Sequence, residues 1–107
     1  MASTIEELLN QAVEVFPSRA SGEDLYEHIN KISVRLIDES REDFIMTMMH
    51  WLELRSEPKT MLAVDIIGKN RLIELKEPLK VLLDDVNKGK AFKSFYERPI
   101  KKSLKQI

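Results

Sequence analysis

Two histidines, His28 and His50, are the only imidazole groups in the chain, and histidine often serves in acid–base and metal chemistry. Asp24 lies four residues before His28, so a helix would place both side chains on one face at a metal-ligand spacing. The chain has no cysteine, and no further histidine or coordinating cluster accompanies this pair. His50 has only Glu53 as an acidic neighbour downstream. We therefore interpret both histidines as ordinary side chains and expect no bound metal.

Motifs of enzymatic catalysis are also missing from the sequence. No serine or threonine lies in a nucleophile-elbow sequence, and no glycine-rich loop is present to bind phosphate. Asp84 and Asp85 are adjacent carboxylates, but we interpret them as the end of a helix rather than an acid–base pair. We expect that the protein is not an enzyme and that it has no cofactor.

The C-terminal segment combines basic and aromatic residues. Residues 87–107 carry seven basic side chains and one acid, and Phe92, Phe95 and Tyr96 lie between them. Cations pair with phosphates and aromatic rings stack on bases, so residues 88–105 are a candidate for single-stranded nucleic acid. The net charge of the whole chain is −1, whereas nucleic-acid-binding domains are usually basic. Packed aromatic rings with lysines in solvent are the favoured interpretation, and nucleic-acid binding is the alternative.

Residues 46–51 form a second cluster, which combines methionines with the single tryptophan, Trp51. Methionine adapts to partner surfaces, and tryptophan is enriched at the centre of interfaces. The same residue types fill protein cores more often than they bind partners. Our candidate partner-binding residues come from this cluster and from the basic segment: Met46, His50, Trp51, Phe95, Tyr96, Arg98, Lys101, Lys102 and Lys105.

Helix start and stop signals predict that these residues lie in an all-α chain. Serine or threonine followed by acids marks helix starts near Thr4, Ser21 and Ser40, and Ser56 precedes a start with proline in the first turn. The last helix either begins near Arg98 or is kinked by the following proline. The ends are marked by Pro17, by Gly68 or Asn70, and by a loop after residue 87. The six predicted helices cover approximately residues 4–16, 21–37, 41–55, 57–70, 73–87 and 98–107.

Composition and charge limit the class of protein. Apolar residues make up 43% of the 107 residues, which is typical of one globular domain over residues 1–107. The first residues carry two acids where a signal peptide would be basic, and no apolar run approaches the ~20 residues of a membrane helix. With the absence of cysteine, this predicts a cytoplasmic protein without a membrane segment. Residues 1–58 hold twelve acids and five basic residues, so their net charge is opposite to that of the basic C-terminal segment.

Short sequence segments recur in alternate helices. Three segments share a pattern in which the second residue is small and the last is isoleucine. They are residues 32–37, 62–67 and 102–107. A small residue permits close helix approach, so the pattern predicts two alternating helix types, as in helical repeats. The end of such an array needs a cover, and a homodimer through Ile100, Leu104 and Ile107 is one way to provide it.

Residues 57–107 resemble the HEAT-like family of helical repeats. Residues 58–68 are similar to the first helix of such a repeat, and residues 75–85 resemble the second, with its early proline, leucine pair and terminal acids. Residues 96–104 are similar to the opening helix of the next repeat. The resemblance implies a short right-handed α–α superhelix that binds other macromolecules and carries no catalytic residue. We therefore expect a non-enzymatic helical-repeat module that recognises a protein partner.

Overall fold

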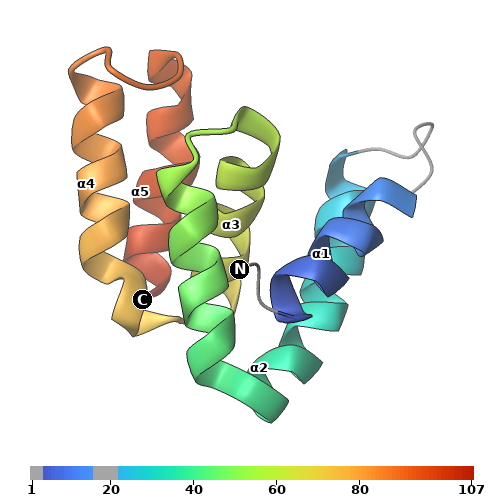
Figure 1. The fold of residues 1–107 in the computed structure, drawn as a ribbon. Coiled ribbons are helices and arrows are strands. Elements are labelled where there is room, and N and C mark those ends of the chain that lie inside the picture. The colour runs from blue at the N-terminus through green and yellow to red at the C-terminus, as the bar shows by residue number, and fades with distance from the viewer. Residues whose placement is uncertain (1–3, 16–21) are drawn as a thin grey trace. The chain divides into compact units, whose positions relative to one another are not determined.

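The computed structural model describes residues 4–15 and 22–107, and all regular structure in this part is helical, as expected (Figure 1). Two short 3-10 helices, η1 (Ile73–Leu75) and η2 (Ser94–Tyr96), precede the last two α-helices. The described part contains five α-helices: α1 (Thr4–Val15), α2 (Gly22–Glu53), α3 (Glu57–Lys69), α4 (Lys76–Asn87) and α5 (Glu97–Gln106).

Helix α2 replaces two of the six helices that the sequence predicts. The expected helices 21–37 and 41–55 run together, and the non-helical residue between them is Ser40, with φ −153° and ψ 67°. Ser40 is the expected start of the third helix, so the sequence signal marks a kink. No loop separates the two parts, because helical structure resumes at the next residue. The described residues therefore contain five α-helices, where the sequence predicts six. Pro17 and Ser21, expected boundaries of the first two helices, lie outside the described residues.

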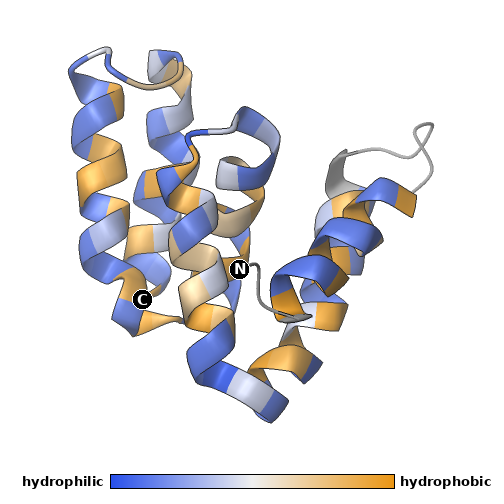
Figure 2. Ribbon diagram, viewed as in Figure 1, coloured by the Kyte–Doolittle hydropathy of each residue, from blue (hydrophilic) through white to orange (hydrophobic). Residues whose placement is uncertain are grey.

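The contact pattern divides the chain into an N-terminal unit, residues 1–47, and a C-terminal unit, residues 48–107. The described N-terminal unit consists of α1 and the first part of α2. Ile5 and Leu9 of α1 are buried, as are Ile29 and Leu36 of α2, at the spacing of one apolar stripe per helix. Figure 2 shows the corresponding apolar residues alternating with polar ones along both helices.

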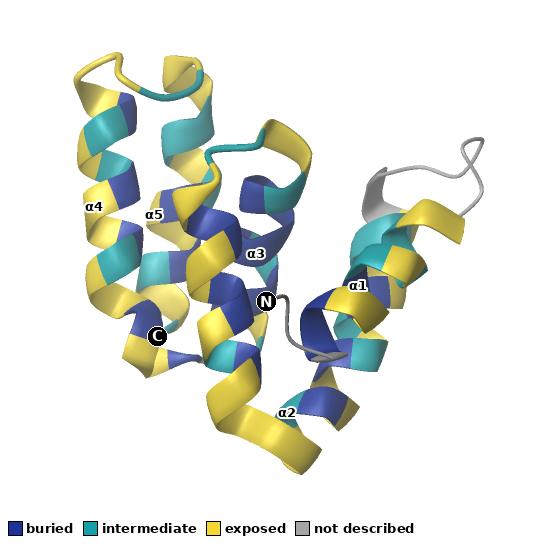
Figure 3. Cartoon of the chain, in the orientation of Figure 1, coloured by how far each residue is buried: buried dark blue, intermediate teal, exposed yellow. Residues whose placement is uncertain are grey.

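The C-terminal unit is built around α3. Residues 60–68 of this helix are all buried except Asp65, so almost its whole circumference is covered (Figure 3). Helix α5 packs closely against both α3 and α4, whereas α3 and α4 approach each other much less closely.

Helices α3 and α5 approach each other closely at Gly68. A Cβ atom built on Gly68 would lie 2.9 Å from the Cα atom of Ser103, so no larger residue fits there without a shift of backbone. The hydroxyl of Ser103 donates a hydrogen bond to the carbonyl oxygen of Val64 at 2.5 Å. Gly68 is thus a packing residue inside α3 rather than its end, and the C-cap is Asn70, the second of the two ends that the sequence allows.

Helices α4 and α5 begin in the same way. Each follows a 3-10 turn, and each has a proline, Pro78 or Pro99, as its third residue. An amide at this position has no partner within the helix, so proline is accommodated without a kink. Glu97 is the first residue of α5, one residue before the expected start near Arg98, and no side-chain hydrogen bond caps η2 or α5.

Candidate partner-binding surface

A groove of about 490 Å³ lies at the start of α5, and we call it the α5 groove. Helix η2 places Phe95 at its edge with 62% of the residue exposed to solvent. The first turns of α5 add two exposed cations, Arg98 and Lys101, one helical turn apart. The lining residues are Ser94, Phe95, Glu97, Arg98 and Lys101.

Neighbouring aromatic rings support Phe95. The ring centroids of Phe95 and Tyr96 are 4.4 Å apart, and Phe92 meets Tyr96 edge-on at 5.7 Å. The Tyr96 hydroxyl donates a hydrogen bond to the carboxylate of Glu57 at the start of α3. These contacts position Tyr96, and the Phe95 ring, which lies tilted against Tyr96, is presented toward solvent.

The electrostatics of the α5 groove are mainly cationic. The ammonium of Lys101 lies 3.6 Å from the Glu97 carboxylate, on a largely exposed helix surface where such a pair contributes little stability. Arg98 is exposed beside them, and Lys102 and Lys105 are exposed further along α5 without lining the groove. An apolar ring beside cations suits a partner segment that carries both apolar and acidic side chains.

The candidate residues of the 46–51 cluster have different environments. Trp51 has no exposed surface, so the expectation that it contacts a partner is wrong. Its carbonyl accepts a hydrogen bond from Thr60, and Lys59 lies 5.9 Å from its ring. The period of the helix explains the error, because Trp51 shares the buried side with Met48 one turn earlier. His50 is exposed in the C-terminal unit.

Met46 is 65% exposed and belongs to the N-terminal unit, so the structure does not group it with the α5 groove. The three residues of the predicted dimer stripe are also not equivalent. Ile100 has no exposed surface and cannot contact a second copy, because Ile100 is part of the core of the C-terminal unit. Leu104 and Ile107 are half-buried.

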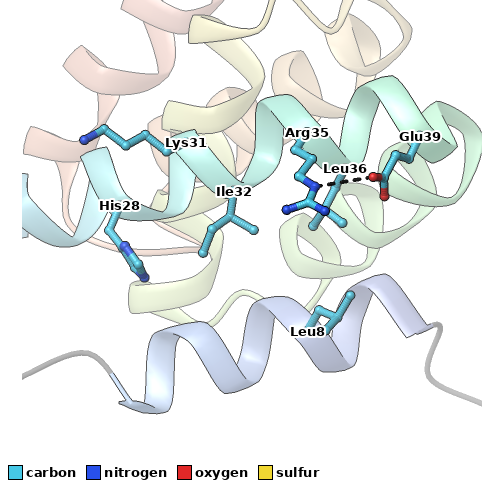
Figure 4. A pocket seen from close by; sticks show the side chains of 7 residues that line it. All are labelled: Leu8, His28, Lys31, Ile32, Arg35, Leu36 and Glu39. Carbon is cyan, nitrogen blue, oxygen red and sulfur yellow. Dashed lines mark hydrogen bonds and ion pairs between the residues drawn. The ribbon is translucent and has the colours of Figure 1, made fainter.

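The N-terminal unit contains a second groove, of about 570 Å³, which sequence reasoning missed (Figure 4). It lies between α1 and α2, and we call it the α1–α2 groove. Two features of the sequence could have indicated this groove. One is Leu8, an apolar residue beside the buried stripe of α1, and the other is the pair of cations Lys31 and Arg35, four residues apart. The groove is lined by Leu8, His28, Lys31, Ile32, Arg35, Leu36 and Glu39.

Residues 4–15 and 22–107 contain no cluster of three or more histidine or acidic side chains placed to hold a metal ion. Across these same ranges, no helix has the length and apolar character needed to cross a membrane. A hydrogen bond from Lys88 to Asp84, together with the charge of that carboxylate at 2.8 Å, raises the pKa of the Lys88 amine. This exposed pair lies at the end of α4, where the sequence predicts a helix end.

Comparisons of the chain with models of protein families, with characterised proteins and with solved structures found no match.

Proposed function

We propose that the chain is a non-enzymatic binding module that recognises a protein partner, with the α5 groove as a contact surface. The observation that supports this most directly is the 62% exposure of Phe95 beside Arg98 and Lys101. Phe44 and Trp51, by contrast, have no exposed surface, so large aromatic rings can be buried in this chain. Exposed aromatic and arginine side chains are the residue types that contribute most at protein interfaces.

The surroundings of Phe95 suit recognition. Because Tyr96 is positioned by Phe92 and Glu57, the Phe95 ring in contact with it loses less conformational freedom on binding than an unsupported side chain. Arg98 offers a planar group that pairs with carboxylates through two hydrogen bonds. We therefore expect the partner to present an apolar side chain flanked by acids.

A co-purification experiment with paired variants tests this proposal. Proteins captured by the tagged parent chain are compared with those captured by Phe95→Ser and by Ile73→Ser. Ile73 is a matched control, because it is 63% exposed and lies on the other 3-10 turn. We expect a protein that the parent and Ile73→Ser retain and that Phe95→Ser loses. The captured protein should bind purified Phe95→Ser about tenfold or more weakly than it binds the purified parent chain, since truncating a central contact costs about 2 kcal/mol.

Two results would contradict the proposal. The first is the absence of any captured protein that distinguishes the two variants, together with a specific hydrolase activity in a broad substrate screen. The second is equal affinity of a captured protein for the parent and for Phe95→Ser.

Nucleic-acid binding through residues 88–105 is a second candidate, supported by the same exposed ring of Phe95 among cations. If it holds, Kd for a fluorescent single-stranded oligonucleotide should weaken steeply with salt, because binding releases counterions. It should also weaken in Lys101→Glu/Lys105→Glu. Binding that ignores both salt and these substitutions would exclude this candidate.

A HEAT-like repeat arrangement and a cytoplasmic location are part of the same proposal. The close packing of α3 on α5 supports the repeat, since residues 62–67 and 102–107 are the segments that the sequence aligns. The weak approach of α3 to α4 counts against it. An experimental structure tests whether the repeat is present. If the α3–α4 pair superposes on a preceding helix pair, the repeat is supported, and if the two pairs do not superpose, the repeat is contradicted.

A further inference from the structure

The α1–α2 groove has an apolar floor and an open side. Ile32 and Leu36 of α2 point toward α1, and Leu8 of α1 points toward them (Figure 4). Leu8 remains 45% exposed, so the two helices do not cover it. Two adjacent helices form the kind of groove in which a third helix packs, and about 570 Å³ lies within the ~300–1,000 Å³ range of binding pockets.

The rim of this groove has a charge opposite to that of its surroundings. Residues 1–47 contain ten acids and only four lysines or arginines, and two of those four, Lys31 and Arg35, line the groove. The Nε atom of Arg35 lies 3.4 Å from the Glu39 carboxylate, but its side chain is 82% exposed and its guanidinium has further donors. Salt screens charges beyond about 10 Å, so these nearby cations determine which side chains are favoured at the rim.

We propose that the α1–α2 groove docks an amphipathic helix of a protein partner. The apolar face of that helix contacts Leu8, Ile32 and Leu36, and an acidic flank pairs with Lys31 and Arg35. Charge complementarity selects this occupant, because a basic helix would place like charges against the rim. Apolar side chains three and four residues apart on the partner would enter the groove, as in other helix-in-groove complexes. This surface is separate from the α5 groove and does not depend on it.

The test uses the full chain and two labelled peptides of about 18 residues, since shorter helices are marginal in water. Both peptides repeat leucine at helical spacing. One carries glutamate on the flanks of the leucine stripe, and the other carries lysine at the same positions. Fluorescence anisotropy should show that the glutamate peptide binds at least about tenfold more tightly than the lysine peptide.

Paired variants locate the binding. Lys31→Glu/Arg35→Glu should weaken binding of the glutamate peptide about tenfold or more and strengthen binding of the lysine peptide. Lys76→Glu/Lys80→Glu is the matched control, because these exposed lysines are also four residues apart, on α4. The control should leave both affinities unchanged. Leu8→Gln, which keeps the rim charges and a good helix former, should weaken both peptides, and circular dichroism confirms that each variant folds.

Several outcomes would overturn the inference. Equal binding of the glutamate peptide to the parent and to Lys31→Glu/Arg35→Glu would do so, as would no measurable binding at millimolar chain concentration. Peptide binding could instead be lost in Phe95→Ser/Arg98→Glu and retained in Lys31→Glu/Arg35→Glu. This result would place the peptide at the α5 groove, which supports the proposed function and refutes this inference. Binding of a single-stranded oligonucleotide that depends on Lys31 and Arg35, without peptide binding, would assign the groove to nucleic acid.

Discussion

The two units of this chain bury their apolar residues in different ways. In the C-terminal unit, α3 is covered on almost every side, and residues 60–68 are buried except Asp65. In the N-terminal unit, α1 buries Ile5 and Leu9 but leaves Leu8 45% exposed. A helix that is apolar on all sides becomes the centre of a core, whereas a helix with one stripe leaves partly covered residues at the edge of that stripe. Such edges form the α1–α2 groove.

The units also differ in how their buried hydroxyls are satisfied. In the C-terminal unit, Thr60 donates to the carbonyl of Trp51, and Ser103 donates to the carbonyl of Val64, so both bonds join different helices. In the N-terminal unit, Ser33 and Thr47 donate to carbonyls four residues earlier in their own helix. Bonds between helices specify how the helices pack, but bonds within one helix do not. The bonds of Thr60 and Ser103 therefore help to specify how α2, α3 and α5 pack in the C-terminal unit.

The largest predicted effect compares two isoleucines that have no exposed surface, Ile66 of α3 and Ile29 of α2. Replacement by alanine should destabilise the protein by about 2–5 kcal/mol in each case. Ile66→Ala should lie toward the upper end of this range, because closely packed helices around α3 cannot collapse into the cavity. Ile29→Ala should cost less, because Ile32, one turn later on α2, lines an open groove and leaves room for relaxation. Urea denaturation gives both values, and an equal or larger loss for Ile29→Ala would remove the proposed difference between the units.

Gly68→Ala tests the close packing of α3 on α5. Alanine gains about 1 kcal/mol of helix propensity over glycine, so a loosely packed site would be stabilised. Here the new Cβ atom would lie 2.9 Å from Ser103 Cα, which requires the backbone of one helix to shift. We expect a net destabilisation of about 1–3 kcal/mol, as for other overpacked sites. A melting temperature equal to or above that of the parent would show that the helices are less tightly packed.

Thr60→Val and Ser33→Ala compare a bond between helices with a bond within one helix. Thr60→Val removes the donor at 2.7 Å from the Trp51 carbonyl and should cost about 1–2 kcal/mol. Ser33→Ala should be close to neutral, because its hydroxyl bonds to Ile29 of the same helix and alanine is the better helix former. Chemical denaturation of the two variants measures the contrast. A cost for Ser33→Ala as large as that for Thr60→Val would contradict it.

The smallest effect concerns two exposed ion pairs, Lys88–Asp84 in the C-terminal unit and Arg35–Glu39 in the N-terminal unit. The folded-state pKa of Lys88 is raised above its ordinary value of 10.5, so its stabilising contribution is complete below that pH and is lost as pH rises through the raised value. Lys88→Met should therefore reduce the fall in stability between about pH 9 and about pH 11.5. Arg35→Met is the control. It should not change the fall in stability between these pH values, because arginine stays charged throughout this range. Unfolding followed by circular dichroism at both pH values measures the difference, and identical pH profiles for the two variants would contradict the prediction.

Several boundaries were predicted correctly because their signals are local. Pro58 lies in the first turn of α3, as expected from its residue type, and Asn70, one of the two ends that the sequence allows, caps the helix. The loop after residue 87 is also present, with Gly89 in the left-handed region at φ 72°. The sequence marks Ser40 as a helix start, and its backbone is indeed non-helical. The sequence did not indicate that the two helical runs on either side of Ser40 would be joined without a loop.

The candidate surface was predicted only in part. Phe95, Arg98 and Lys101 were chosen from a basic and aromatic segment, and the structure brings them together at one groove. Trp51 was chosen for its residue type, but whether a tryptophan is a core residue or an interface residue depends on the neighbours that cover it. Nothing in the sequence indicated that Tyr96 would reach Glu57, because these residues are far apart along the chain.

By itself, the sequence determined the helical class, most helix starts and ends, and the uneven distribution of charge, since these depend on residues within one or two turns of each other. Only the tertiary structure decided that α5 packs against both α3 and α4, that Trp51 and Ile100 are buried, and that a groove opens beside Leu8. The physical reason is that an apolar stripe specifies which face of a helix is buried but not which helix covers it. The choice of partner depends on close approaches such as that of Gly68 to Ser103, which form only when distant segments pack.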